Sequence, residues 1–184
     1  YGEFCRQVSK QLAPGDDSFV ALLSQGTSGD AWRRDYGKEK SPDVTIQAYT
    51  ASLVTLAREA LQEVTHRHHL PLAMEESRLT LQRRTPDETR LAWARKILAA
   101  MEGRRSRNRP EVYAEQAVFL HENPQEEIVL QAIRLGELGL TAIPNEVYAL
   151  TGLKLKKGSP LDTTANLSLA NGAAGYIPSP EQHH

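Results

Sequence analysis

The stretch IVLQAIRLGELGLTAIPNEV, residues 128–147, decides the fold class. From 128 to 133 its side chains alternate between two apolar-rich faces, which is the period of a β-strand. Gly136 and Glu137 then form a two-residue turn with glycine first, an order typical of a type II′ hairpin. Residues 138–143 return as a second strand. The stretch therefore predicts an antiparallel hairpin, with Pro144 closing it.

Helices and strands alternate on both sides of this hairpin. Apolar residues three and four apart predict helices over 4–12, 46–64, 85–101, 110–120 and 146–154, and short apolar runs predict strands over 19–23, 74–81 and 167–170. Pro42 and Asp43 are expected to begin the long second helix, and Thr85 is expected to cap the third, with Glu88 completing a capping box. The run 19–23 has the composition of a strand buried on both faces.

This pattern predicts a mixed α/β, or α+β, fold. We expect a layered domain with a mixed sheet that includes the antiparallel hairpin, and helices packed on the outside. A length of 184 residues suits one domain. Apolar residues make up 40% of the chain and charged residues 24%, which is typical of a globular protein.

Charge and cysteine content exclude several classes of protein. Lysine and arginine number 22 against 23 acidic residues, so the net charge of −1 argues against nucleic-acid binding by overall basic charge. Cys5 stands alone, which rules out an internal disulfide framework. The longest uncharged run, 163–180, is broken by glycines and prolines, so we expect no transmembrane segment.

Two polar clusters allow either a binding or a structural interpretation. His66, His68 and His69 could supply a metal-ligand pair, but a solvated group at the end of the long helix is the favoured interpretation. The arginines between 104 and 109 could bind phosphate or an anionic membrane surface. A solvated linker between two helices is favoured there, because no aromatic residue is interleaved to stack on bases.

Polar residues also follow the predicted strands, where sites commonly lie. Gly29 and Asp30 are in a loop of small residues after the run 19–23, although turn chemistry alone explains them. Glu146 and Tyr176 each come after an apolar strand. A carboxylate can bind zinc, and a phenolate can do so when the metal lowers its pKa. A helix-terminal glutamate and a packed tyrosine are the structural alternatives.

Four parts of the chain, in this order, resemble a known family. They are YGEF at 1–4, LSQGTSGD at 23–30, LTAIPNEV at 140–147, and SLANG with GYIPSPEQH at 168–172 and 175–183. They span nearly the whole chain, and the last two are the most specific. The sequence resembles the catalytic domain of the neutral/alkaline non-lysosomal ceramidases, in particular the shorter bacterial members.

The resemblance implies a zinc amidase that splits the N-acyl bond of ceramide into sphingosine and a fatty acid. It implies that Glu146 and Tyr176 are metal ligands, and that two histidine ligands precede Tyr1. A further family tyrosine would follow His184, and His183 is assigned no role. Gly29 and Asp30 are expected near the site without an assigned catalytic role. Trp32 stands where the family has a serine credited with catalysis.

We therefore expect residues 1–184 to be a single-domain fragment of a ceramidase-like catalytic domain, truncated at both ends and inactive alone. The chain has no initiator methionine, which agrees with this interpretation. The expected cofactor is zinc and the expected partner a lipid amide such as ceramide, with no nucleic acid. The resemblance implies a secreted, periplasmic or cell-surface parent protein, and the oligomeric state stays open.

Three alternatives also stay open. The scaffold could hydrolyse another amide or an ester, because loops set substrate choice on a shared fold. Trp32 at the serine position favours a non-catalytic family member. An unrelated α/β binding module whose loops match by chance is the third.

Overall fold

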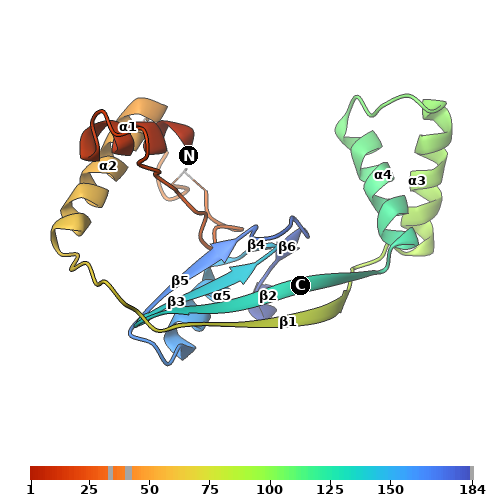
Figure 1. Cartoon of the computed structure of the whole chain (residues 1–184). Helices are drawn as coiled ribbons and strands as arrows, with labels where there is room; N and C mark the ends of the chain where they lie inside the picture. Colours follow the sequence, from red (N-terminus) through yellow and green to blue (C-terminus); the bar gives the residue numbers. More distant parts are fainter. Residues whose placement is uncertain (33–34, 40–42, 183–184) are drawn as a thin grey trace. The chain divides into compact units, whose positions relative to one another are not determined.

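A computed structural model of the chain describes residues 1–32, 35–39 and 43–182 (Figure 1). Its helices are α1 Gly2–Leu12, α2 Ile46–Gln62, α3 Glu88–Met101, α4 Arg109–Glu122 and α5 Ala149–Gly158, with a 3-10 turn at Pro180–Gln182. Its strands are β1 Leu72–Gln82, β2 Gln125–Leu135, β3 Leu138–Ile143, β4 Glu146–Val147, β5 Thr163–Ser168 and β6 Tyr176–Ile177. The predicted mixed α/β class is confirmed. Pro42, His183 and His184 lie outside the described residues.

Four strands form one mixed sheet in the order β1-β2-β3-β5. The predicted hairpin is confirmed, because β2 and β3 pair antiparallel from Gln131↔Ala142 to Leu135↔Leu138. Gly136 has a φ of 63° and Glu137 has no positive φ, as a type II′ turn requires. Strands β3 and β5 run parallel, and β4 and β6 form a separate parallel pair.

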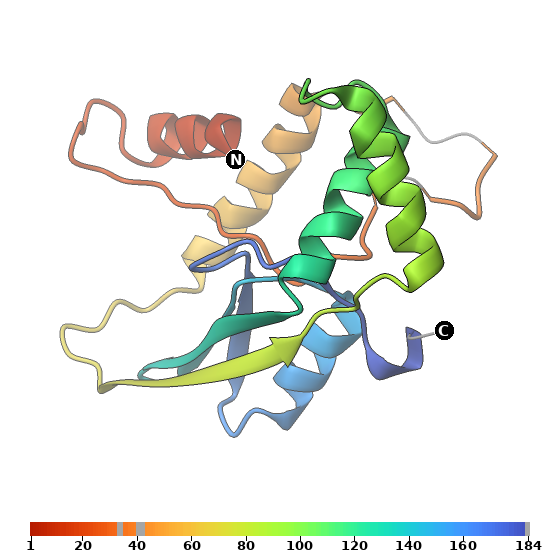
Figure 2. The same cartoon turned by 90° about the vertical axis from the view of Figure 1, so that its right-hand side faces the viewer.

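The parallel pair β3 and β5 is connected through α5. This helix packs against β5, and Figure 2 shows it beside the strands. Inside that contact, Asn166 Nδ2 donates to the carbonyl oxygen of Gly152 at 2.9 Å, and Thr141 Oγ1 donates to Asn166 Oδ1 at 2.8 Å. A buried asparagine thus joins β3, β5 and the helix.

The chain divides into two compact units. Unit 1 comprises Tyr1–Glu75 with Gln131–His184, and unit 2 comprises Glu76–Leu130, so the boundary falls inside β1 and β2. Within unit 1, α1 packs against α2. Helix α2 buries Thr50 and Val54, whereas Ile46 and Tyr49 of the predicted apolar face are 71% and 60% exposed. The contact with α1 therefore buries only part of the apolar face that the sequence predicts for α2.

Unit 2 contains the pair of helices α3 and α4, which lie side by side in Figures 1 and 2. The buried centre of their contact is made of small residues, Ala94, Ala114 and Ala117, which allow close approach of the two backbones, and larger apolar side chains pack around it. The N-cap of α3 is Asp87, whose Oδ1 accepts from Arg90 N at 2.7 Å, so the expected cap at Thr85 is wrong. Pro86 favours an extended Thr85, and the helix begins after it.

Three further sequence predictions need correction. Residues 19–23 form no strand, and Val20 and Leu22 are 74% and 86% exposed, because a short apolar run without a partner strand has nothing to pair with. The helix expected over 146–154 begins only at Ala149, since residues 146–147 pair with β6. The strand expected over 167–170 ends at Ser168, where Leu169 turns to a φ of 55°.

Candidate functional site

Glu146 and Tyr176 lie opposite each other on neighbouring strands. The parallel pairing of β4 with β6 puts Glu146 in register with Tyr176 and Val147 with Ile177. Glu146 N donates to the carbonyl of Gly175 at 2.9 Å, and Tyr148 N donates to that of Ile177 at 3.1 Å. Two residues separated by thirty positions in the chain are therefore held side by side by backbone hydrogen bonds.

The Glu146 carboxylate influences the pKa of Tyr176. The pKa of the Tyr176 phenol is raised above its ordinary value of 10.0, first because the phenol hydrogen-bonds to the Glu146 carboxylate and then because of that negative charge. Tyr176 is 59% exposed, so solvent and ligands have access to it. The neighbouring carboxylate therefore favours the protonated form of the phenol.

Tyr148 adds a second aromatic ring to the site. Its ring lies 6.4 Å from that of Tyr176 at an interplanar angle of 80°, the edge-to-face geometry that aromatic pairs prefer. Tyr148 is half-buried, and the sequence analysis did not single it out. The sequence could have indicated Tyr148 only by its position, two residues after the carboxylate of Glu146 at the end of a strand.

The loop that contains Gly29 and Asp30 docks onto the segment after Glu146. Gly29 N donates to the carbonyl of Val147 at 2.8 Å. A Cβ at Gly29 would come within 2.5 Å of the Glu146 carbonyl oxygen, so this approach requires glycine. The loop therefore lies next to Glu146, and its glycine serves a close backbone contact.

Asp30 acts on the helix that follows Glu146. Its Oδ1 accepts from Ala149 N at 2.7 Å, while Tyr148 at the N-cap position makes no side-chain cap bond to any described residue. The negative carboxylate also suits the positive end of the α5 dipole. Asp30 thus supplies the cap of α5 from a distant loop.

Gln25 connects this loop to the sheet and braces it internally. Gln25 O accepts from Ser168 N at 2.9 Å, and Gln25 Nε2 donates to Ser28 Oγ at 2.8 Å. Tyr1 Oη donates to Gln25 Oε1. Trp32, two residues after Asp30, is 71% exposed, so an indole occupies the position at which the family resemblance would place a hydroxyl.

Asn145 is a site residue that the sequence analysis missed. It is only 3% exposed, and its Nδ2 donates to the carbonyl of Ala174 at 2.8 Å. Its Oδ1 is buried and has no hydrogen-bond partner among the described residues, and the same holds for Ser168 Oγ on the adjoining strand end. In the sequence, an asparagine between a proline and a glutamate indicates only a turn, so its buried hydrogen bond is not predicted.

The described residues supply two oxygen donors for a metal at this site, the Glu146 carboxylate and the Tyr176 phenol. Within 1–32, 35–39 and 43–182 there is no group of three or more His, Cys, Asp or Glu side chains placed to hold a metal ion. Zinc sites use three or four protein ligands, with oxygen, nitrogen and sulfur all accepted. The two donors fit part of such a set and need further ligands to complete it.

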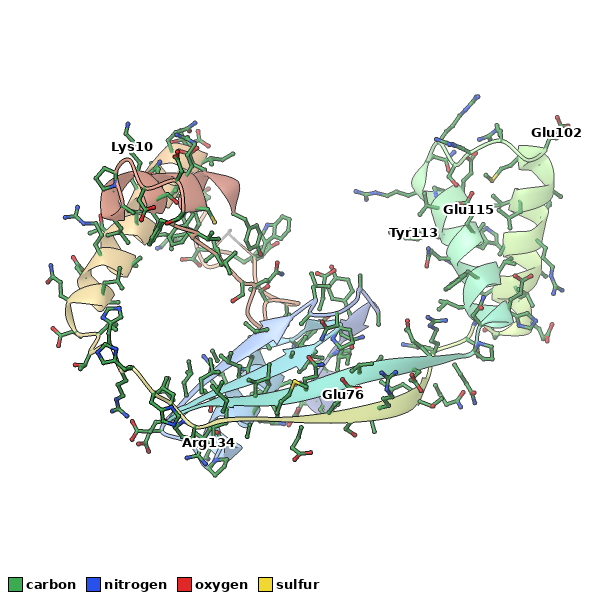
Figure 3. All side chains as sticks on the ribbon, in the orientation of Figure 1. Lys10, Glu76, Glu102, Tyr113, Glu115 and Arg134 are labelled. Atoms are coloured by element: carbon green, nitrogen blue, oxygen red, sulfur yellow. The ribbon has the colours of Figure 1, made fainter. Side chains whose placement is uncertain are left out.

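The remaining polar clusters lie elsewhere. His66, His68 and His69 come after the end of α2, in exposed irregular chain, so they face water as expected but are not helical. Arg104, Arg105 and Arg107 connect α3 to α4, which confirms the linker interpretation for these three, whereas Arg109 is the first residue of α4. Figure 3 shows Glu102 at the end of α3, where this connection begins. Arg104 is paired with Glu111, and Arg105, Arg107 and Arg109 are exposed.

An apolar cavity of about 590 Å³ lies in unit 1, apart from these site residues. Residues of β2, β3 and α5 line it, among them Ile133, Leu140 and Leu155. It reaches Gly158 at the far end of α5 from Glu146. None of the helices in the described part of the chain combines the length and apolar character that crossing a bilayer requires.

Comparison with solved structures finds a relative of the fold. The crystal structure of neutral ceramidase from Pseudomonas aeruginosa matches with a TM-score of 0.58 and 12% sequence identity. The match covers 95% of this chain and 34% of the ceramidase chain, so this chain spans about a third of that protein's length. No protein-family model matches the sequence, and the search of curated proteins finds no match. The chain shares the fold of part of a neutral ceramidase, at a distant level of similarity.

Proposed function

We propose that this chain forms part of a zinc-dependent amide hydrolase similar to neutral ceramidase, which cleaves N-acylsphingosine into sphingosine and a fatty acid. The observation that carries the proposal is the register of Glu146 with Tyr176 in a fold that matches a ceramidase. The site residues suggested by the sequence resemblance are brought together by strands that the resemblance did not specify.

Glu146 and Tyr176 would hold the metal as oxygen ligands, with two histidines from a segment before Tyr1. Bound zinc supplies a Lewis acid that polarises an amide carbonyl and acidifies a water molecule. Tyr176 would bind the metal as a phenolate, beside the Glu146 carboxylate. Gly29 and Asp30 hold the backbone of this segment in place through Val147 and Ala149.

The 184-residue chain by itself is expected to have little or no activity, because it contributes only part of the ligand set. Turnover of an amide by the purified chain, blocked by a chelator, would contradict this. A longer form that carries the preceding segment is the form in which activity should be measured.

Trp32 favours a second candidate function. An exposed indole cannot act as the hydroxyl that the family resemblance places at this position. The same scaffold would then act on another amide or ester, or bind a lipid amide without cleaving it.

The test compares zinc content and hydrolysis of a fluorescent ceramide in the longer form and in two variants. Glu146→Ala should lose both zinc and turnover at unchanged fold, whereas Glu137→Ala, in the exposed hairpin turn, should keep both. Zinc retention by Glu146→Ala refutes the ligand role. Zinc binding that depends on Glu146, without ceramide turnover, supports the second candidate instead.

A further inference from the structure

The segment from Leu169 to Gly175 leads from β5 to Tyr176 through an unusual backbone. Leu169, Asn171 and Gly175 have φ values of 55°, 65° and 76°. A left-handed conformation costs little at glycine or asparagine but is strained at leucine. Such a turn keeps its shape only if neighbouring groups hold it.

Asn145 bonds to both ends of this turn, to one through its backbone and to the other through its side chain, beside backbone bonds that Ile143 and Pro144 accept from Ala170 N and Ala174 N. Its carbonyl oxygen accepts from Leu169 N at 3.2 Å, where the turn begins. Its side-chain Nδ2 donates to the carbonyl of Ala174 at 2.8 Å, where the turn ends. Asn145 directly precedes Glu146, and Ala174 lies two residues before Tyr176. The buried carboxamide therefore connects the two segments immediately before the two site residues.

The polar side chain of Asn145 lowers the stability of its buried position, which argues for a role beyond packing. Asn145 Oδ1 is buried without a partner among the described residues, and an unsatisfied buried acceptor is destabilising. An apolar side chain of the same size would avoid that cost but would leave the Ala174 carbonyl without its donor. Departures of this kind from local stability are expected at functional sites.

We propose that Asn145 is a positioning residue, whose buried carboxamide fixes Glu146 opposite Tyr176 by holding the Ala174 end of the 169–175 turn. Its consequence for metal binding rests on the proposed function. The positioning itself does not, because it is a property of the metal-free chain.

The experiment measures amide hydrogen exchange by NMR in the metal-free 184-residue chain. Asn145→Leu removes the donor with little change in volume and charge. We expect the amides of Glu146 and Tyr148, which bond across to the β6 segment, to exchange roughly tenfold faster, while the amides of β3 and β5 change by less than about twofold.

Asn166→Leu is the matched control. Asn166 is also buried, at 6% exposure, and its Nδ2 also donates to a backbone carbonyl, that of Gly152 at 2.9 Å. This variant should speed exchange in α5 and β5 and leave Glu146 and Tyr148 unchanged. If Asn145→Leu does not fold, Asn145→Ser, whose hydroxyl is too short to replace the carboxamide, should show the same local pattern.

Unchanged exchange at Glu146 and Tyr148 in the Asn145 variants overturns the proposal. The proposal is equally overturned if the Asn145 and Asn166 variants raise exchange everywhere to the same extent, since Asn145 would then be one more packing residue. Zinc titration of the longer form separates the two proposals. A local exchange response without any zinc binding removes the metal function and leaves the positioning role intact.

Discussion

The helical pair of unit 2 and the strand ends of unit 1 differ in how completely their buried polar groups are hydrogen-bonded. In the pair α3 and α4 the caps are local, the buried centre of the contact is alanine, and the buried carboxylate of Glu111 is fully engaged by Arg104 and the Arg107 N–H. Ser106 Oγ is the buried group left unpaired there among the described residues.

At the strand ends of unit 1, by contrast, an amide oxygen and a hydroxyl are buried without partners among the described residues, a leucine is left-handed, and a carboxylate raises the pKa of an exposed phenol. The strand ends of unit 1 therefore combine more departures from local stability than the helical pair of unit 2 does. Such departures are typical of functional sites.

The largest effect should come from the core of unit 2. Leu91 is 2% exposed, so Leu91→Ala leaves a cavity and should lower the free energy of unfolding of this unit by about 3 kcal/mol. Urea denaturation measures the loss. Leu153→Ala on α5, where the side chain is 62% exposed, should cost far less. Equal losses in the two variants would mean that unit 2 lacks the packed core described for it.

A glycine contact should give the largest effect at the strand ends. A Cβ at Gly152 would lie 1.9 Å from Thr27 Oγ1, so Gly152→Ala should displace the 24–30 loop from α5 and cost about 2 kcal/mol. Gly158→Ala, in the same helix with nothing within 4 Å, is the control and should be neutral or slightly stabilising. A neutral Gly152→Ala would show that the loop does not pack there.

The helix caps make the comparison direct. Asn108 caps α4 from within, through its Oδ1 and Glu111 N at 3.0 Å, whereas Asp30 caps α5 from the distant loop. Asn108→Ala and Asp30→Ala should each cost about 1 kcal/mol in thermal unfolding. Only Asp30→Ala should also speed amide exchange at Gly29, because it loosens the loop. The absence of that extra response would mean that the loop is held without the cap.

Unit 2 should also show a gradual response to acid. The pKa of Glu111 is held at about 2, against an ordinary value of 4.5, first by the hydrogen bonds from Arg104 and then by the Arg107 N–H. A folded pKa below the unfolded one stabilises the fold above pH 4.5, and this contribution is lost as the pH falls towards 2. Glu111→Gln should flatten the dependence of the melting temperature on pH over that range, and Glu115→Gln, on the exposed side of α4, should preserve it.

Sequence patterns predicted the elements whose structure depends on neighbouring residues in the chain. The alternation around residues 128–143 and the glycine at 136 were sufficient for the β2–β3 hairpin, because a strand period and a turn residue act over a few positions. The run 19–23 failed as a strand, since pairing depends on a partner that periodicity does not reveal.

The candidate site depends on long-range contacts, which local sequence patterns do not predict. No periodicity places Glu146 beside Tyr176; their candidacy came from family resemblance, and their pairing comes from the long-range register of β4 with β6. Asn145 escaped prediction because its role depends on a carbonyl 29 residues further along the chain. Sequence alone does not tell which side of a turn points into the protein.

The cap that α5 receives from Asp30 has a consequence for how the chain acquires its structure. The two bonded residues are 119 positions apart, so closing that loop carries a large entropic cost before the contact forms. During synthesis the 24–30 segment leaves the ribosome long before its helix exists, and completion of α5 must await a late, non-local encounter. Non-local contacts of this kind slow folding, so the elements around Glu146 should be among the last to mature.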